Sequence, residues 1–230
     1  MPSTIFKGKS DLGYRGDAIL QLDWAVGEIM KQIEYLGIEN NTIIVFSSDN
    51  GPVLDDGYQD DAVTKINGHT PTGKLRGGKY SLFEAGTRVP FIVSWPKKIK
   101  PNVSDALISQ IDLLRSFSKM LNSKIPENEA KDSEDILNAL LGKSPKGRSV
   151  LVEQGASLAI IQDNWKFIEP NNYPEVYTLT NIELGNSKSP QLYDLSKDIG
   201  EKNNLANENS QKLKELTILL QKIKSSTETE

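Results

Sequence analysis

Residues 42–52, TIIVFSSDNGP, place an apolar, β-branched stretch directly before a polar turn. A run of this kind that is bounded by Gly-Pro is typical of a buried strand in an open α/β sheet. Asp49 and Asn50 follow its carboxyl end, where such sheets place their ligand sites. Both side chains offer hard oxygen donors, as Ca²⁺ or Mg²⁺ requires. Because Asp-Asn-Gly is also an ordinary turn sequence, the motif alone leaves both interpretations open.

A second motif, LRGGKYSLFEAGTRVPF, occupies residues 75–91. The order of SDNGP, a polar loop, LRGGK and E-x-G-x-RVPF resembles the sulfatase family of the alkaline-phosphatase-like superfamily. Further segments resemble the family in the same order along the chain, which makes chance a poor explanation. They are GDAILQLDWAVG (16–27), PFIVSWP (90–96), VSDALISQIDLL (103–114), NWKFI (164–168) and QLYDLSKDIGEKNNLA (191–206).

The resemblance implies roles for four residues. Asp49 and Asn50 would supply two oxygen ligands to a Ca²⁺ ion that orients the sulfate ester. Lys79, which follows Gly77-Gly78, would contact the substrate sulfate and disperse charge as the S–O bond breaks. His69, the one histidine of the chain, would bind substrate or protonate the leaving oxygen, and an exposed loop histidine is the equal alternative. Arg76, Glu84 and Arg88 are expected to brace the loop through ion pairs.

The nucleophile that the family uses is missing from this chain. Sulfatases modify the first residue of a C/S-x-P-x-R motif to formylglycine, which is hydrated, attacks sulfur, releases the alcohol and later expels sulfate. The chain has no Cys, and its nearest serine pattern, Ser94-Trp95-Pro96-Lys97-Lys98, ends in Lys. Ser94 is more simply the end of a strand. The resemblance therefore implies the C-terminal portion of a sulfuric ester hydrolase, with an incomplete Ca²⁺ site, that is inactive alone.

Other functions stay open beside this one. The chain could be a non-catalytic truncated fragment, or part of a related superfamily phosphodiesterase or phosphonate hydrolase. LRGGK followed by E-x-G-x-RVPF favours a sulfatase, acting on sulfate esters of sugars or aryl alcohols. Four aspartates in the polar loop match no EF-hand spacing and are expected to be solvated; they are Asp55, Asp56, Asp60 and Asp61.

Composition excludes some partners and leaves the compartment open. A net charge of −4 over 230 residues gives no indication of the excess positive charge that is typical of nucleic-acid-binding proteins. No apolar run approaches the roughly 20 residues of a membrane helix. The start, MPSTIF, lacks the pattern of a signal peptide. The compartment is unknown from this chain, although the family is often periplasmic or secreted.

The expected fold class is α/β: the C-terminal part of an alkaline-phosphatase-like mixed sheet flanked by helices, then a small antiparallel sheet with a helix. We expect a catalytic-domain part at 1–121, a connecting segment at 122–149 and an α+β subdomain at 150–230.

Without the sheet strands that would flank it in a complete domain, the region around 40–100 should expose apolar surface. Trp24, Trp165 and Tyr193 are expected in the core. Apolar periodicity predicts helices at 17–36, 105–121, 133–141 and 210–223, and strands at 42–48, 89–95, 150–153, 158–162, 165–169, 176–179 and 191–195.

Overall fold

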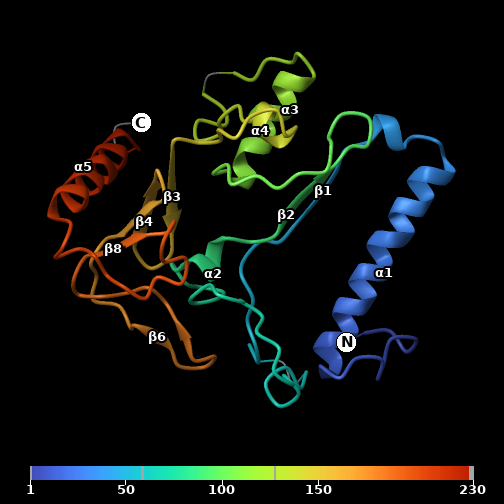
Figure 1. Ribbon diagram of the computed structural model, residues 1–230, viewed down its shortest axis with the longest axis horizontal. Helices are drawn as coiled ribbons and strands as arrows, with labels where there is room; N and C mark the ends of the chain where they lie inside the picture. Colours follow the sequence, from blue (N-terminus) through green and yellow to red (C-terminus); the bar gives the residue numbers. More distant parts are fainter. Residues whose placement is uncertain (1, 58–59, 127, 228–230) are drawn as a thin grey trace.

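The first part of the molecule consists of one long helix and a two-stranded ribbon. The computed structural model describes residues 2–57, 60–126 and 128–227. Helix α1 (Gly13–Tyr35) leads through the 3-10 helix η1 (Glu39–Asn41) into strand β1 (Ile44–Ser47). Strand β1 pairs antiparallel with β2 (Phe91–Ser94). In Figure 1 this ribbon runs between α1 on one side and the C-terminal sheet on the other.

The ribbon is less buried than its sequence predicts. A continuous apolar run predicts a strand covered on both faces, yet every residue of β1 is only half-buried. Among the described residues β1 pairs with β2 alone, so its second edge is uncovered there. Within residues 40–100, the exposed apolar side chains of Val63 and Ile92 agree with the uncovered surface expected there. Helix α1, which precedes that region, also exposes apolar side chains. They include Ile19, Leu22, Ile29 and Trp24, whose expected place in the core is therefore wrong.

Two short helices and one longer helix follow β1 along the chain. Helix α2 (Glu84–Thr87) precedes β2, and α4 (Leu137–Leu140) lies within the predicted span 133–141. Helix α3 (Leu113–Met120), with the 3-10 turn η2 (Gln110–Asp112) before it, begins later than the predicted residue 105. A capping box between Ser109 and Asp112 sets this start, because Ser109 is extended and its amide donates to Asp112 Oδ2 at 3.0 Å.

The C-terminal sheet has the four-stranded antiparallel order β3-β4-β5-β8. The sequence predicts short strands and a small antiparallel sheet here, but not this order. The first three strands of the sheet are consecutive along the chain and are joined by two hairpin turns. In the predicted turn between β4 and β5, Asp163 and Asn164 both adopt positive φ angles. A separate small hairpin joins β6 and β7. The strands are β3 (Val150–Gln154), β4 (Leu158–Gln162), β5 (Trp165–Ile168), β6 (Val176–Tyr177), β7 (Ile182–Glu183) and β8 (Gln191–Asp194).

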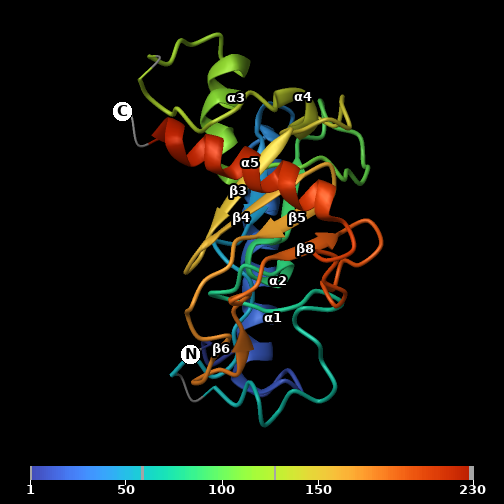
Figure 2. The ribbon, with the colours of Figure 1, turned by 90° about the vertical axis from the view of Figure 1, so that its left-hand side faces the viewer.

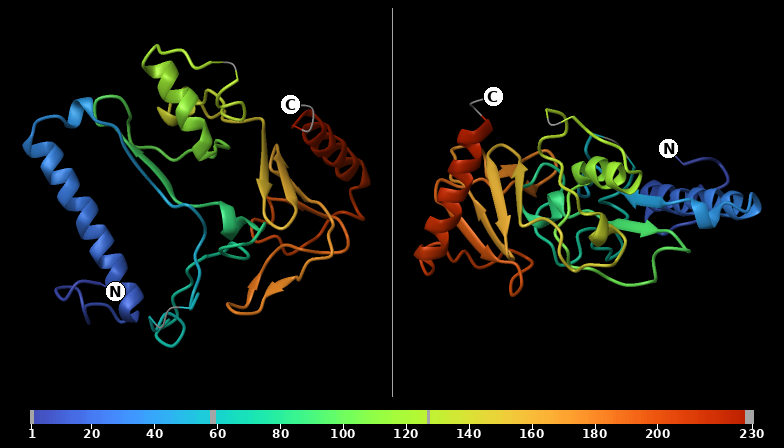
Figure 3. Two further views of the ribbon diagram at one scale, coloured as in Figure 1. Left: turned by 180° about the vertical axis from the view of Figure 1, so that it is seen from behind. Right: turned by 90° about the horizontal axis from the view of Figure 1, so that it is seen from above.

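This sheet is covered on both faces. Helix α5 (Ser210–Thr227) crosses one face, as Figure 2 shows, and buries Leu216 and Leu220 completely against it. The other face packs on Leu82 and Phe83, in the segment that leads into α2. Seen from behind and from above, α5 is the outermost layer (Figure 3). The sheet is therefore a platform that holds the LRGGKYSLFE segment on the side opposite α5.

No helix in the described part of the chain combines the length and the hydropathy that a membrane-spanning segment requires.

Candidate functional site

Residues 48–50 form a polar turn at the carboxyl end of β1. Ser48 Oγ donates to the carbonyl oxygen of Asn50 at 3.0 Å, and the Asn50 amide donates to Asp49 Oδ1 at 3.0 Å. Gln110 Nε2 donates to the carbonyl oxygen of Ser48 at 2.6 Å, which ties the turn to η2. The side chain of Asp49 is exposed. The turn thus presents a carboxylate and an amide side by side.

Close backbone contacts join this turn to the RGGK segment. The Gly51 amide donates to the Gly86 carbonyl oxygen at 2.9 Å, and the Lys79 amide donates to the Pro52 carbonyl oxygen at 2.9 Å. A Cβ atom on Gly51 would lie 1.6 Å from the carbonyl oxygen of Ala85. A Cβ atom on Gly78 would lie 2.7 Å from the carbonyl oxygen of Pro52. Only glycine permits this approach, so the two motifs are built to lie against each other.

The turn offers the type of oxygen ligand that a hard divalent cation prefers, but too few of these ligands to complete its coordination. Asn50 Nδ2 donates to the Gly51 carbonyl oxygen at 2.9 Å, which leaves Asn50 Oδ1 free of hydrogen bonds from the described residues. Asp49 Oδ2 is free in the same sense. A Ca²⁺ ion needs six to eight oxygens. No group of three or more His, Asp or Glu suited to a metal occurs in the described part of the chain.

The Lys79 side chain lies in a polar cluster with Asp56 and Tyr80. Lys79 Nζ is 3.1 Å from Asp56 Oδ2, and the Tyr80 hydroxyl donates to the same oxygen at 2.8 Å. The hydrogen bond to Asp56 raises the pKa of Lys79 and keeps its ammonium charged. Hydrogen bonds from Tyr80 and Lys79 lower the pKa of Asp56. Asp56 was expected to be solvated in the loop, and the structure instead places it on the candidate sulfate-binding lysine.

His69 is exposed in the same long loop. Its backbone amide donates to the Ile66 carbonyl oxygen at 2.8 Å, and its imidazole has no hydrogen-bond partner among the described residues. The structure therefore brings Asp49, Asn50 and Lys79 onto contacting segments, whereas no described contact joins His69 to them.

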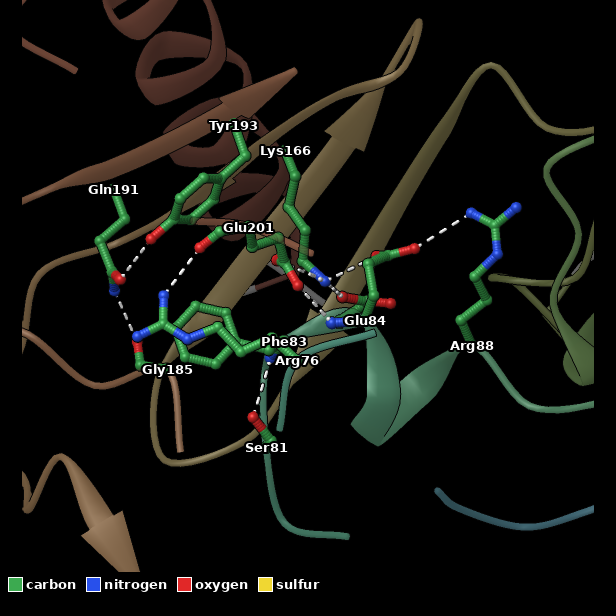
Figure 4. Close-up of polar contacts among 11 residues, drawn as sticks. Arg76, Ser81, Phe83, Glu84, Arg88, Lys166, Gly185, Gln191, Tyr193 and Glu201 are labelled. Carbon is green, nitrogen blue, oxygen red and sulfur yellow. Dashed lines mark hydrogen bonds and ion pairs between the residues drawn. The ribbon is translucent and has the colours of Figure 1, made fainter. Parts of the chain in front are cut away.

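A buried charge cluster anchors the RGGK segment to the C-terminal sheet, and sequence reasoning missed its centre. Lys166 on β5 is fully buried, with Nζ 2.9 Å from Glu84 Oε1 and 3.0 Å from Glu153 Oε2 (Figure 4). Glu201 Oε1 lies 3.6 Å from the same ammonium, and Glu201 Oε2 accepts the Glu84 amide at 2.6 Å. Arg88 Nη1 reaches Glu84 Oε2 at 3.1 Å. These contacts fix α2, and with it Gly86, against the sheet.

Charge balance explains the titration of this cluster. Burial alone would lower the pKa of Lys166, but the three carboxylates outweigh burial and raise it. Burial would likewise raise the pKa of Glu84, but Lys166 and then Arg88 lower it. For Glu201 burial dominates and raises the pKa to about 7. Three carboxyls thus share two cations, and Glu201 is the one that takes up a proton near neutral pH.

Arg76 forms a second anchor from the RGGK motif to the C-terminal sheet region. Its guanidinium makes two hydrogen bonds to the Glu183 carboxylate, at 2.6 and 2.9 Å, and one to the carbonyl oxygen of Glu201 at 2.7 Å. It also stacks 4.0 Å from the centre of the Phe83 ring. Arg76, Glu84 and Arg88 therefore all form the ion pairs expected of bracing residues.

A pocket at the start of α1 shares no lining residue with SDNGP or LRGGK. It is lined by Asp17, Asp61 and Lys65 among others. The Asp17 carboxylate accepts three backbone amides, from Gly8, Lys9 and Ser10, at 2.7 to 3.0 Å. Asp17 therefore holds the N-terminal loop.

Comparison with known proteins agrees with the motifs. The family model Sulfatase matches residues 3–123. An N-acetylgalactosamine-6-O-sulfatase of Bacteroides thetaiotaomicron is 52% identical over 98% of this chain and 44% of its own length. Human arylsulfatase A is 30% identical over 87% of this chain and 40% of its own length. A solved structure from Bacteroides thetaiotaomicron, described with the metabolism of multiple glycosaminoglycans, superposes with a TM-score of 0.94 at 53% identity, over 96% of this chain and 47% of that one.

The fold is that of the C-terminal region of an alkaline-phosphatase-like hydrolase. With a model match over more than half of its residues, the chain belongs to the sulfatase family. Members of this family hydrolyse sulfate esters and generally use a metal ion. The chain spans less than half the length of the curated relatives named here.

Proposed function

We propose that this chain provides the metal-binding and sulfate-binding side of a sulfuric ester hydrolase that acts on a sulfated sugar. Asp49 and Asn50 would each give one oxygen to a Ca²⁺ ion, and Lys79 would bind the sulfate group. The observation that carries the proposal is the pair of backbone hydrogen bonds, Gly51 to Gly86 and Lys79 to Pro52, that joins the two motifs. The 52% identity to an N-acetylgalactosamine-6-O-sulfatase supports a sugar sulfate as substrate.

Each residue has a defined task in this proposal. A bound Ca²⁺ ion would withdraw charge from the sulfate oxygens, and Asp49 and Asn50 would hold it at the end of β1. Lys79 keeps a full positive charge because Asp56 stabilises its ammonium form. A fixed cation beside the sulfate lowers the barrier where negative charge develops on the oxygens. His69 would bind substrate or protonate the departing alcohol oxygen, and its exposed imidazole is open to either.

The nucleophile does not come from the residues of this chain. There is no Cys to convert to formylglycine. Ser94 is the last residue of β2 and pairs with Ile44, as expected of a strand residue. The catalytic unit therefore needs a segment that carries the C/S-x-P-x-R motif.

The proposal is tested with a chimera in which this chain follows the part of the Bacteroides relative that it does not match. The chimera should release sulfate from N-acetylgalactosamine 6-sulfate in the presence of Ca²⁺. Lys79→Ala and Asp49→Asn should each lower kcat/KM by about 100-fold or more, the usual loss when one fixed charge-stabilising group is removed. Lys97→Ala, at an exposed lysine after β2, is the matched control and should leave activity unchanged.

Two results would contradict the proposal. Near-normal turnover by Lys79→Ala and Asp49→Asn would remove these residues from the site. A chimera that hydrolyses a phosphodiester or phosphonate monoester in preference to the sulfate ester would favour the related superfamily enzymes.

A further inference from the structure

Tyr80 adopts a backbone conformation that tyrosine rarely takes. Its φ angle is +77°, in the left-handed region that favours glycine. Strain of this kind persists only where the surrounding structure enforces it, and it is concentrated at ligand-binding sites. The residue lies directly after Lys79, the proposed sulfate ligand. The conformation therefore calls for a cause at this position.

Burial of the ring does not supply that cause. Tyr80 remains 45% exposed, whereas Leu82, two residues later, is fully buried in the core. The phenol is held instead at the surface by two contacts. Its hydroxyl donates to Asp56 Oδ2 at 2.8 Å, and its ring meets that of Tyr177 edge-on, with 5.1 Å between the ring centres. Tyr177, on β6, is itself 37% exposed.

These side chains combine the groups that recognise a sugar ring. Two exposed aromatic rings offer apolar surface to the C–H face of a pyranose. The carboxylate of Asp56 is a strong acceptor for sugar hydroxyl groups. The ammonium of Lys79, 3.1 Å from that carboxylate, is the neighbouring site for an anion. Binding sites of this composition are mostly apolar, with a few polar groups that fix the orientation of the ligand.

We infer that Asp56, Tyr80 and Tyr177 form a subsite for the sugar ring of the sulfate ester, beside the sulfate site at Lys79. The inference rests on the proposed function for its choice of ligand. The β6–β7 hairpin then helps select the substrate, because it carries Tyr177. Arg76 fixes this hairpin through its two hydrogen bonds to Glu183 on β7.

The strained φ angle of Tyr80 allows an experiment to distinguish a ligand-binding role of this residue from a purely structural one. Tyr80→Gly removes both the aromatic ring and the unfavourable φ angle, so it should leave the melting temperature unchanged or raise it. The same change should raise KM for N-acetylgalactosamine 6-sulfate about ten-fold, the loss expected for one aromatic contact. Tyr80→Phe keeps the ring and should stay within about three-fold of the parent. Tyr177→Ala should raise KM as Tyr80→Gly does.

The chimera is the test protein, with Leu179→Ala as the control for an exposed side chain in the turn of the same hairpin. Inhibition by inorganic sulfate reports on the proposed sulfate site, at Lys79 and the Ca²⁺ ion, and not on the sugar subsite. Its inhibition constant should therefore not change in Tyr80→Gly or Tyr177→Ala. Binding of N-acetylgalactosamine 6-sulfate is also measured directly by calorimetry, which does not require turnover. An unchanged KM and unchanged sugar affinity in both variants would overturn the subsite.

The two proposals fail in different ways. If the chimera is inactive but binds the sugar in a manner that depends on Tyr80, the subsite stands and the proposed catalysis fails. If Lys79→Ala abolishes turnover while Tyr80→Gly and Tyr177→Ala behave as the parent, the catalysis stands and the subsite fails. If Tyr80→Gly lowers the melting temperature and raises both the KM for the sugar sulfate and the inhibition constant of inorganic sulfate, Tyr80 serves the fold and the inference is wrong.

Discussion

Replacing Glu201 with glutamine should stabilise the protein at alkaline pH and flatten the dependence of its stability on pH. Glu201 is fully buried beside Lys166, Glu84 and Glu153. Its pKa is about 7 in the folded protein, compared with an ordinary value of 4.5. At pH values between these two, Glu201 keeps its proton in the folded protein and has released it in the unfolded chain. The free energy of unfolding must therefore fall as pH rises through this window.

The size of the effect follows from that difference in pKa. Each factor of ten in proton affinity is worth about 1.4 kcal/mol, so the full decline due to Glu201 is about 3 kcal/mol. Glutamine is neutral at every pH, and its side-chain oxygen can still accept the Glu84 amide. Glu201→Gln should thus match the parent near pH 4.5 and exceed it by up to about 3 kcal/mol at pH 8.

Urea unfolding followed by circular dichroism between pH 4.5 and 8.5 measures this difference. Arg76 and Tyr193 also adjoin Glu201, so the control must leave them in place. Glu208→Gln, at an exposed position later in the same connection, should shift the curve by no more than about 0.5 kcal/mol. A Glu201→Gln variant that is less stable than the parent at pH 8, or that keeps the same decline, would refute the charge-balance argument.

Three further predictions concern the same structure. Lys166→Met should destabilise the protein by about 3 to 5 kcal/mol at pH 8 in urea unfolding, because it leaves three buried carboxyls with one partly exposed cation; a loss below 1 kcal/mol would contradict this. Amides of β1 should exchange hydrogen faster than those of the central strands β4 and β5, since β1 is half-buried with one partner strand among the described residues; equal protection would count against an uncovered ribbon. The chain alone should not hydrolyse a chromogenic aryl sulfate with added Ca²⁺, since it has no residue that can become formylglycine; turnover that Lys79→Ala abolishes would reveal a different nucleophile.

The C-terminal sheet was predictable because each of its signals is local. Alternation of apolar residues located β3, β4, β5 and β8, and Asp163-Asn164 marked the hairpin turn that the structure contains. The motifs SDNGP and LRGGK located the candidate site through their resemblance to the sulfatase family, and their glycines permit the close backbone contact that the structure shows. Three roles remain predictions: Asp49 and Asn50 as metal ligands, Lys79 as a catalytic and sulfate-binding residue, and His69 as a substrate-binding residue.

Features that depend on distant partners were not predictable. Lys166 reads as an ordinary strand residue in NWKFI, and its burial becomes intelligible only with Glu84, Glu153 and Glu201 around it. The apolar run at 42–48 predicted a buried strand, but burial depends on neighbouring strands that the described residues do not supply. The strained φ angle of Tyr80 leaves no mark in a sequence that otherwise reads as a loop after two glycines.

Through the charge cluster, the C-terminal sheet positions the proposed sulfate and metal ligands, although it supplies none of these ligands itself. Lys79 lies between Arg76 and Glu84, and both of these residues are fixed to the C-terminal region, through Glu183 and through Lys166. Glu84 begins α2, which carries Gly86, and Gly86 accepts the backbone bond from Gly51 that follows Asp49 and Asn50. A displacement of α2 would therefore move the proposed sulfate ligand and the proposed metal ligands together. The buried lysine on β5, which is costly to desolvate, contacts carboxylates on α2, on β3 and in the connection after β8, and these contacts hold the three elements in one geometry.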